Sequence, residues 1–353
     1  MISGKYLRMT VRFGIMVLLS GFTACGVQKN TDETTSVAEE QSRETVIAES
    51  ETAVTEQLQS REQIMEESVG DCETMTSEEL GAPQYEMPAE PAQSQPVEYI
   101  DLQQITLDST WEYADHSKIN TGAAVLYPAP EESGRKGIVI GVNAGHGTAG
   151  GAKVKTLCHP DGSAKVTGGS TAAGATSAAA VSGGMTFQDG TPEREVTLRM
   201  AQILRDKLLT SGYDVLMLRD SEDVQLDNVA RTVICNNVAD CHIALHWDSG
   251  DGKNYDKGCF YISVPEALKT MEPVASHWQQ HDTLGTDLVE GLREQGAMIY
   301  GKGNMSIDLT QTSYSTIPSV DMELGNAYSD HSDVVLEQLA TGLLAGINTY
   351  FEQ

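Results

Sequence analysis

The chain has 353 residues and carries 51 acidic against 23 basic side chains, for a formal net charge of −28. Binding to nucleic acid needs a cationic face, so this balance argues against nucleic acid as a partner. The length allows one or two domains, and the composition changes sharply along the chain.

Residues 1–25 have the features of an export signal. The cations come first, at Lys5, Arg8 and Arg12. The apolar stretch 13–22 follows, and it is too short to span a bilayer. The segment ends in Gly-Phe-Thr-Ala-Cys25-Gly, which resembles a bacterial lipobox with Cys25 as the lipidated residue. We therefore expect a lipoprotein signal peptide and an exported protein held at the outer face of the cytoplasmic membrane, with an ordinary secretory signal as the alternative.

Residues 26–97 are rich in Glu, Thr, Ser, Gln and Pro and poor in large apolar side chains. Such a stretch cannot bury enough apolar surface to offset its ordering entropy, so we expect it to be disordered. A flexible segment of this length has a root-mean-square reach of roughly 45 Å, and like charges extend it further. We interpret the segment as an acidic tether between a membrane anchor and a folded domain. A low-complexity tract without a role is the alternative.

The remainder of the chain has the pattern of an α/β domain. Residues 98–136 are expected to form an N-terminal extension that packs on the core, with short strands at 97–100 and 123–127. In the region 137–353, the expected strands are 138–142, 213–218, 241–245, 257–264 and 319–324. The expected helices are one that opens at 191–193 and stops at Gly212, then 224–238, 282–294 and a last one with apolar residues from 336 to 350. This order predicts a single mostly parallel sheet with helices on both faces.

The segment 147–192 interrupts this pattern, because it has little strand or helix signal. Within it, residues 168–184 are Gly, Ser, Thr and Ala apart from Val181. A loop of that length in a compact domain is usually functional or disordered. Small residues let the backbone approach a ligand closely, so we favour a lid or a substrate-contact loop.

Two histidines and two glutamates occupy positions from which they can converge. His146 and His246 each follow an apolar strand, Glu193 begins a helix, and Glu323 ends the last buried strand. Groups at the carboxyl ends of parallel strands meet in one crevice. Two imidazoles and one carboxylate around an open position are a typical catalytic zinc site, and a further glutamate can transfer protons. Each residue alone is as well explained by a structural role, but the combination indicates a zinc hydrolase.

Other candidate sites are weaker. His277 and His281 have the i, i+4 spacing of a zincin helix without the glutamate that must follow the first histidine. The six cysteines include no CxxC pair. Cys235 and Cys241 lie close enough in sequence to pair, but their apolar surroundings favour reduced, buried thiols.

The stretch 212–246 carries the most specific motifs. Its motif positions are Arg219, Asp223, Asn228, Arg231, Asn236, Asn237, Asp240 and His246. They follow, nearly position for position, the TR…D, R…AN and AD…H pattern of one family. Through them, residues 137–352 resemble the zinc-dependent N-acetylmuramoyl-L-alanine amidases, which cleave the bond between muramic acid and the peptide in bacterial peptidoglycan.

The resemblance implies that Zn²⁺ is the cofactor, that His146, Glu193 and His246 are its ligands, and that Glu323 is the catalytic glutamate. The family's metal-binding glutamate precedes a Val-x-Leu-x-x-Ala run, which selects Glu193 over its rival Glu195. In such a site the metal polarises the scissile carbonyl and activates water, and the catalytic glutamate carries a proton from that water to the departing nitrogen.

The remaining expectations concern surroundings and partners. Asp240 or Asn237 is expected to lie behind the metal ligands, and Arg219 and Arg231 to pair with acids. The expected partners are peptidoglycan and, through the lipid, the membrane, with no nucleic acid. A zinc carboxypeptidase or deacetylase acting on wall fragments and a non-catalytic wall-binding lipoprotein are the alternative functions.

Overall fold

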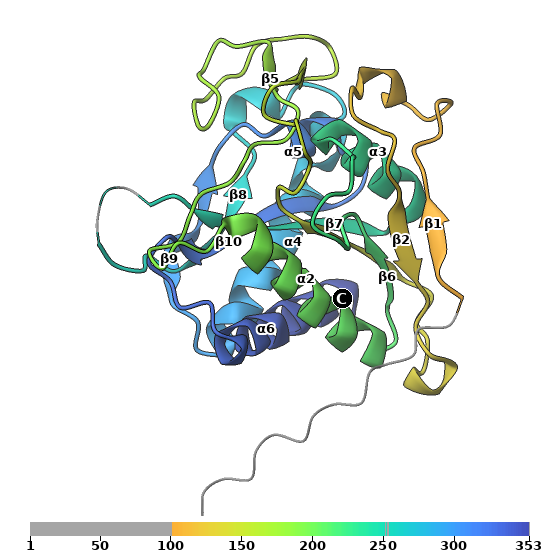
Figure 1. The fold of residues 1–353 in the computed structure, drawn as a ribbon, viewed down its shortest axis with the longest axis vertical. Coiled ribbons are helices and arrows are strands. Elements are labelled where there is room, and N and C mark those ends of the chain that lie inside the picture. The colour runs from red at the N-terminus through yellow and green to blue at the C-terminus, as the bar shows by residue number, and fades with distance from the viewer. Residues whose placement is uncertain (1–100, 251, 253, 353) are drawn as a thin grey trace, which may run out of the picture. The chain divides into compact units, whose positions relative to one another are not determined.

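The computed structural model describes residues 101–250, 252 and 254–352 (Figure 1). The expected signal peptide with Cys25, the tether 26–97 and the expected strand at 97–100 lie outside the described residues. In the described ranges, none of the helices is both long enough and apolar enough to cross a membrane.

The described residues form one eight-stranded sheet with the order β1-β2-β6-β3-β7-β10-β8-β9. Its strands are β1 (Gln103–Ile105), β2 (Ala124–Tyr127), β3 (Val139–Ala144), β6 (Asp214–Met217), β7 (Cys241–Asp248), β8 (Cys259–Ser263), β9 (Ile299–Ser306) and β10 (Ser319–Asn326). The four central strands β6, β3, β7 and β10 run parallel to one another. Within this sheet, the antiparallel pairs are β1 with β2, β2 with β6, and β8 with β10. The predicted mostly parallel sheet is confirmed.

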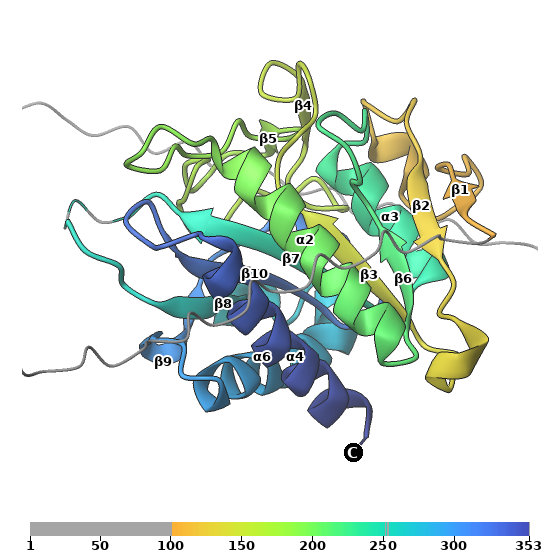
Figure 2. The same ribbon diagram turned by 60° about the horizontal axis from the view of Figure 1, so that its bottom comes forward.

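Helices cover both faces of this sheet, as predicted (Figure 2). They are α2 (Glu193–Thr210), α3 (Asn228–Val238), α4 (Val274–Glu294), α5 (Thr310–Tyr314) and α6 (Asp333–Phe351). On one face, α2, α4 and α6 bury apolar side chains such as Leu204, Leu288 and Leu343 against the central strands. On the other face, α3 packs Ala230 and Ile234 against β2 and β6. The central strands are therefore shielded on both sides, which explains their continuous apolar sequences.

Two strands differ from the sequence expectation. Segment 101–136 does not merely flank the core, because β2 continues the main sheet by pairing with β6. Strand β7 extends to Asp248, so His246 lies within the strand rather than after it. The backbone ladder with β10 continues past the apolar residues, since Glu323 pairs with His246 and Asn326 with Asp248.

The long segment 147–192 lies at one end of the sheet and forms a layer of its own (Figure 1). It contains a small antiparallel sheet made by β4 (Lys155–Leu157) and β5 (Ser177–Ala179). Strands of three residues are too short to show an alternating hydrophobic pattern, so they could not be predicted from the sequence.

Candidate active site

His146 leaves the end of β3 in a left-handed backbone conformation, with φ of 66°. Residues with a side chain rarely adopt this conformation, and it marks a sharp turn. The glycines on either side serve different purposes. Gly147 also has positive φ, at 69°. A Cβ atom on Gly145 would lie 2.2 Å from the His246 ring, so only glycine lets the two imidazoles approach.

Glu193 is the first residue of α2, and its side chain is 3% exposed. Both carboxylate oxygens have backbone donors: the Met185 amide lies 2.8 Å from Oε2 and the Trp247 amide 3.0 Å from Oε1. Burial alone would raise the pKa of this carboxyl, but hydrogen bonds and charge from His146 and His246 lower it well below its usual range. Glu193 is therefore a fixed carboxylate that keeps its negative charge.

The start of α2 also separates Glu193 from Glu195. Glu195 is exposed and pairs with Arg194 at 3.5 Å, so it points away from the histidines. Thr191 makes no capping hydrogen bond with its side chain, and Pro192 occupies the N-cap position instead.

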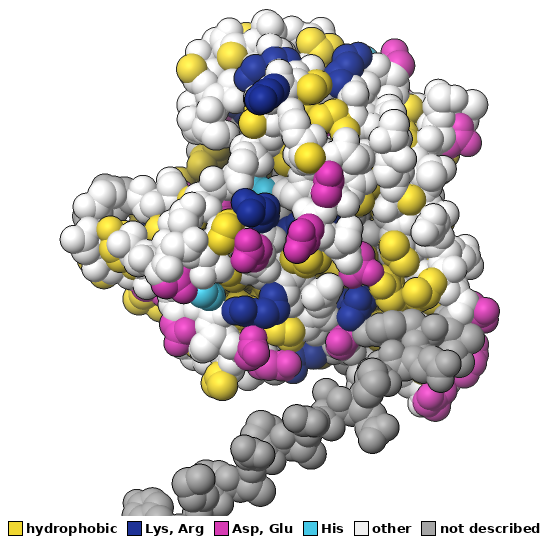
Figure 3. All heavy atoms as spheres, viewed as in Figure 1, with side chains coloured by type: hydrophobic (Ala, Val, Ile, Leu, Met, Phe, Trp, Pro, Cys, Tyr) yellow, Lys and Arg dark blue, Asp and Glu magenta, His cyan; other side chains and the backbone are white. Residues whose placement is uncertain are grey.

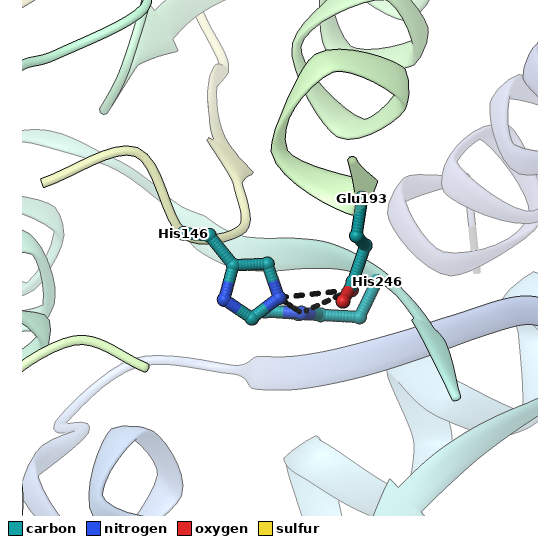
Figure 4. A group of neighbouring side chains, drawn as sticks. All are labelled: His146, Glu193 and His246. Atoms are coloured by element: carbon teal, nitrogen blue, oxygen red, sulfur yellow. Dashed lines mark hydrogen bonds and ion pairs between the residues drawn. The ribbon is translucent and has the colours of Figure 1, made fainter. Parts of the chain in front are cut away.

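Three potential ligand atoms meet at one point (Figure 4). His146 Nε2 lies 2.9 Å from Glu193 Oε1, and His246 Nδ1 lies 3.1 Å from each of these two atoms. His146 Nδ1 lies 3.0 Å from the carbonyl oxygen of Ser182, which can only accept a hydrogen bond. Nδ1 therefore carries the proton, and Nε2 presents a lone pair to the other two atoms. Lone pairs on atoms this close repel one another, so a proton or a cation must lie between the three atoms.

This donor set fits a zinc ion. Tetrahedral ligands at 2.0–2.1 Å from zinc stand about 3.4 Å apart, a little more than the 2.9–3.1 Å between these atoms. Small outward shifts of the side chains therefore admit the ion. Burial would lower the pKa of His246, but the carboxylates of Asp321, Glu193 and Glu323 raise it to about 10. The surroundings thus favour positive charge at the position where a metal would lie.

Glu323 lies on β10 directly beside His246 in the parallel register, so both side chains leave the same face of the sheet. Burial and the neighbouring Asp321 raise the pKa of Glu323 well above its usual range. Its Oε2 atom is buried and has no hydrogen-bond partner among the described residues. The Glu323 carboxyl group therefore lies close to His246 and has one oxygen, Oε2, that is available for a hydrogen bond.

Asp321 was not anticipated from the sequence. Its Oδ2 lies 3.8 Å from His246 Nε2, the ring nitrogen that faces away from the cluster. Within the described chain its Oδ1 is buried without a hydrogen-bond partner. A usable signal existed, because Asp321 and Glu323 alternate with Val320, Met322 and Leu324 on one strand and so share one face.

Two buried arginines hold the turn that carries His146. Arg231 donates to the carbonyl oxygens of Ala144 at 3.1 Å and His146 at 2.7 Å. Arg219 donates to the carbonyl oxygens of Ala144 at 3.1 Å and Gly145 at 3.0 Å. The expectation that these arginines pair with acids is wrong: among the described residues, their hydrogen-bond acceptors are carbonyl, amide and hydroxyl oxygens. They satisfy backbone groups that a tight turn leaves unpaired.

Asp240 and Asn237, which were expected to lie behind the metal ligands, make other contacts. Asp240 accepts a hydrogen bond from the Val139 amide at 2.7 Å, and Asn237 donates to the Val233 carbonyl at 2.8 Å. These contacts stabilise the ends of a strand and a helix. The groups that orient the ligands are the Ser182 carbonyl and the two backbone amides that bind Glu193.

The weaker candidates have structural roles. His281 is buried and accepts a hydrogen bond from the Ser319 amide at 2.9 Å, while His277 donates to the Pro273 carbonyl at 2.8 Å. Within the described ranges, the free, buried cysteines are Cys158, Cys235, Cys241 and Cys259. The expectation of reduced thiols at 235 and 241 is confirmed.

A cleft with a cavity volume of about 170 Å³ opens beside the histidines. It is lined by Asn143, Gly145, His146, Lys155, Lys165, Ser170, Thr171, Ala178, Ala179, Val181, Ser182, Asn228, Arg231, His246, Leu309, Thr310, Gln311 and Asp321. This space is small for a whole ligand, so only the reacting part of a larger molecule fits within it.

Fold and site together define the class: an α/β enzyme domain with a His-Glu-His group, able to hold a metal ion, beside the central parallel strands. Residues 140–345 match the family model for N-acetylmuramoyl-L-alanine amidases. Because this match spans more than half of the chain, the chain belongs to the N-acetylmuramoyl-L-alanine amidase family. The resemblance found in the sequence is confirmed, and the enzyme class is that of an amidase.

Solved structures with a similar fold include three amidases. Ami1 from Mycobacterium smegmatis has a TM-score of 0.51 and 16% identity, covering 61% of this chain and 97% of that one. Ami1 from Mycobacterium abscessus has a TM-score of 0.49 and 19% identity, with 61% and 99% covered. AmiC2 of Nostoc punctiforme has a TM-score of 0.45 and 15% identity, with 62% and 99% covered. The first supports the α/β fold. The chain has no match among curated protein sequences.

Proposed function

We propose that this protein is a zinc-dependent amidase that hydrolyses the bond between N-acetylmuramic acid and L-alanine in peptidoglycan. The observation that carries the proposal is the meeting of His146 Nε2, Glu193 Oε1 and His246 Nδ1 within 2.9–3.1 Å of one another. Membership of the amidase family supports the choice of the bond that is cleaved.

In this proposal, His146, Glu193 and His246 hold the zinc ion. When bound, zinc polarises the scissile carbonyl and lowers the pKa of its water. The protein prepares the ligands beforehand. The Ser182 carbonyl keeps the proton of His146 on Nδ1, and backbone amides fix both oxygens of Glu193. Little reorganisation is then needed to bind the ion.

Glu323 acts as the general base and acid. It takes the proton from the attacking water and delivers it to the departing alanine nitrogen. Burial and the charge of Asp321 raise its pKa well above its usual range, which makes it a stronger base than an exposed glutamate. Asp321 faces the outer nitrogen of His246 and acts as a positioning residue for that imidazole.

The proposed cellular setting follows from the N-terminal sequence. Residues 1–25 direct export, lipid on Cys25 anchors the protein at the outer face of the cytoplasmic membrane, and residues 26–97 tether the enzyme. Residues 98–136 extend the catalytic domain 137–353. Membrane attachment brings the domain close to its peptidoglycan substrate.

Mass spectrometry of digested muropeptides tests the proposed reaction. An amidase releases peptides that begin with L-alanine and leaves free lactyl groups on the glycan. Shortened peptides on intact muramic acid would identify a carboxypeptidase, and loss of acetyl groups a deacetylase. Binding to cell walls without any product would identify a non-catalytic wall-binding protein.

A further inference from the structure

The insertion 147–192 is fixed to the body of the enzyme. His159 Nε2 lies 2.9 and 3.0 Å from the two carboxylate oxygens of Asp308, and both side chains are fully buried. The Val166 amide donates to Asp308 Oδ2 at 2.8 Å, and the Asp308 amide donates to Thr167 Oγ1 at 2.8 Å. The Lys165 ammonium also donates to the Asp308 carbonyl. These contacts make the insertion a fixed wall rather than a swinging lid.

This wall forms one side of the cleft at the active site. Lys155, Lys165, Ser170 and Thr171 from the insertion line the same cavity as His146 and His246. A substrate whose scissile amide lies at the histidines must therefore run along the insertion.

The charge of the insertion is opposite to that of the whole chain. Residues 147–192 contain three lysines and two acidic residues, Asp161 and Asp189, although the chain as a whole has a net charge of −28. The three lysines are Lys153, Lys155 and Lys165. Figure 3 shows basic side chains gathered over this layer, at the top of the view. A locally basic wall beside the reacting groups favours an anionic part of the substrate.

Lys155 is the available cation among the insertion residues that line the cleft. The Lys165 ammonium is buried and held by the carbonyl and carboxylate of Asp308. Arg231 is buried and engaged by the turn that carries His146. Lys155 is exposed, and no described residue makes a hydrogen bond or ion pair with its ammonium group.

We propose that Lys155 binds a carboxylate group of the peptide part of the substrate, close to the scissile amide. The inference rests on the proposed function, because that reaction places a peptide in the cleft. The cavity volume of about 170 Å³ limits the distance between the scissile amide and the bound carboxylate, so this carboxylate belongs to a residue near the L-alanine. The acidic residue that lines the cleft is Asp321, which lies beside His246. Lys155 thereby gives the enzyme a preference for acidic over amidated peptides.

Two synthetic probes test this preference: N-acetylmuramoyl-L-alanyl-glutamate with free carboxylates, and the same compound with both carboxylates converted to amides. With the zinc-loaded full chain, we expect kcat/KM for the acid to exceed that for the amide about tenfold, mainly through KM. Lys155→Gln should bring the ratio close to one, and Lys155→Arg should keep most of the preference, because it keeps the charge.

Lys153→Gln is the matched control. It removes the same charge from an exposed position two residues away that does not line the cleft. The acid-to-amide ratio should stay as in the unmodified protein. An unchanged ratio in Lys155→Gln, or an equal loss of preference in both variants, overturns the inference.

Binding separates this inference from the proposed reaction. Calorimetry with the Glu323→Gln variant measures the affinity for both probes without turnover. The double variant Glu323→Gln/Lys155→Gln shows how much of this affinity depends on Lys155. If the unmodified protein cleaves neither probe, the proposed function fails. Tighter binding of the acid that depends on Lys155 still supports this inference, whereas equal or undetectable binding of the two probes overturns it.

Discussion

At the scale of single residues, the site depends on how closely two imidazoles approach. The turn through Gly145 places His146 against His246, with ring centroids 4.6 Å apart. An added methyl group at Gly145 would occupy the space of the His246 ring, with contacts of 2.2–2.6 Å. Glycine is thus required here for a ligand contact as well as for a turn.

Gly145→Ala should therefore displace His246 and impair metal binding. We expect zinc content to fall to about a tenth of a full equivalent, because the three donor atoms no longer share one point. Elemental analysis measures the zinc, and circular dichroism checks that the fold is kept. Gly168→Ala is the control, since its nearest neighbour lies at an ordinary 3.8 Å. Full zinc occupancy in Gly145→Ala would contradict the account of this turn.

Glu323→Gln should remove catalysis while leaving zinc content and fold unchanged. The amide matches the carboxylate in size but cannot take the proton, and general acid–base groups contribute about 10²–10⁴-fold to rates. The measurement is kcat on a soluble muropeptide. Glu195→Gln, at an exposed position, should keep the full rate. More than about a tenth of the original rate in Glu323→Gln would rule out proton transfer by this residue.

The sequence indicated His146, Glu193 and His246 because each follows an apolar strand or begins a helix, and it indicated Glu323 through the family resemblance. It did not single out Asp321, although Asp321 lies two residues before Glu323 and therefore shares a face of the strand with it. Nor could it show that Arg219 and Arg231 serve backbone carbonyls. Spacing along the chain says nothing about which acceptor a long side chain reaches in the folded molecule.

At the scale of secondary-structure elements, strand centres were easier to predict than strand ends. The apolar residues of β3 and β7 mark two-sided burial, whereas β7 continues through polar residues to Asp248. The ladder with β10 depends on backbone groups, which all residues except proline provide. Hydrophobic patterns therefore predict where a strand is buried but not how far its pairing extends.

The turn between β3 and the insertion should owe much of its stability to Arg231. Arg231→Met removes hydrogen bonds to the carbonyls of Ala144 and His146 and leaves these buried acceptors unpaired. We expect the free energy of unfolding to fall by about 3 kcal/mol. Arg199→Met, at a partly exposed position on α2, should lower it by less than about 1 kcal/mol. Urea denaturation measures both, and equal losses would contradict the role given to Arg231.

At the scale of the whole molecule, the sequence separates a long acidic segment from the enzyme domain. In the proposed cellular setting, a domain anchored without residues 27–96 would stay close to the membrane, and a flexible tether of that length would add roughly 45 Å of reach by chain statistics. The mostly parallel sheet was predictable because buried strands and helices alternate along the chain. The layer formed by residues 147–192 was not, because its contacts with Asp308 join parts of the chain that are far apart in sequence.

Deleting residues 27–96 while keeping Cys25 should leave cleavage of soluble muropeptides unchanged and reduce cleavage of intact cell walls several-fold. The reason is geometric, because the catalytic domain itself is unaltered. Both forms should be compared in the same cells, with release of peptides that begin with L-alanine as the measure. Equal release from the wall would leave the segment without this function.

Metal analysis of the purified protein tests most directly whether His146, Glu193 and His246 bind a single zinc ion. We predict one equivalent of zinc per chain in the unmodified protein and in His277→Ala, whose imidazole lies on α4 and bonds to a backbone carbonyl. His246→Ala should lose nearly all of its zinc, because two remaining ligands hold the ion poorly. Stoichiometric zinc in His246→Ala would show that these three residues are not the zinc ligands.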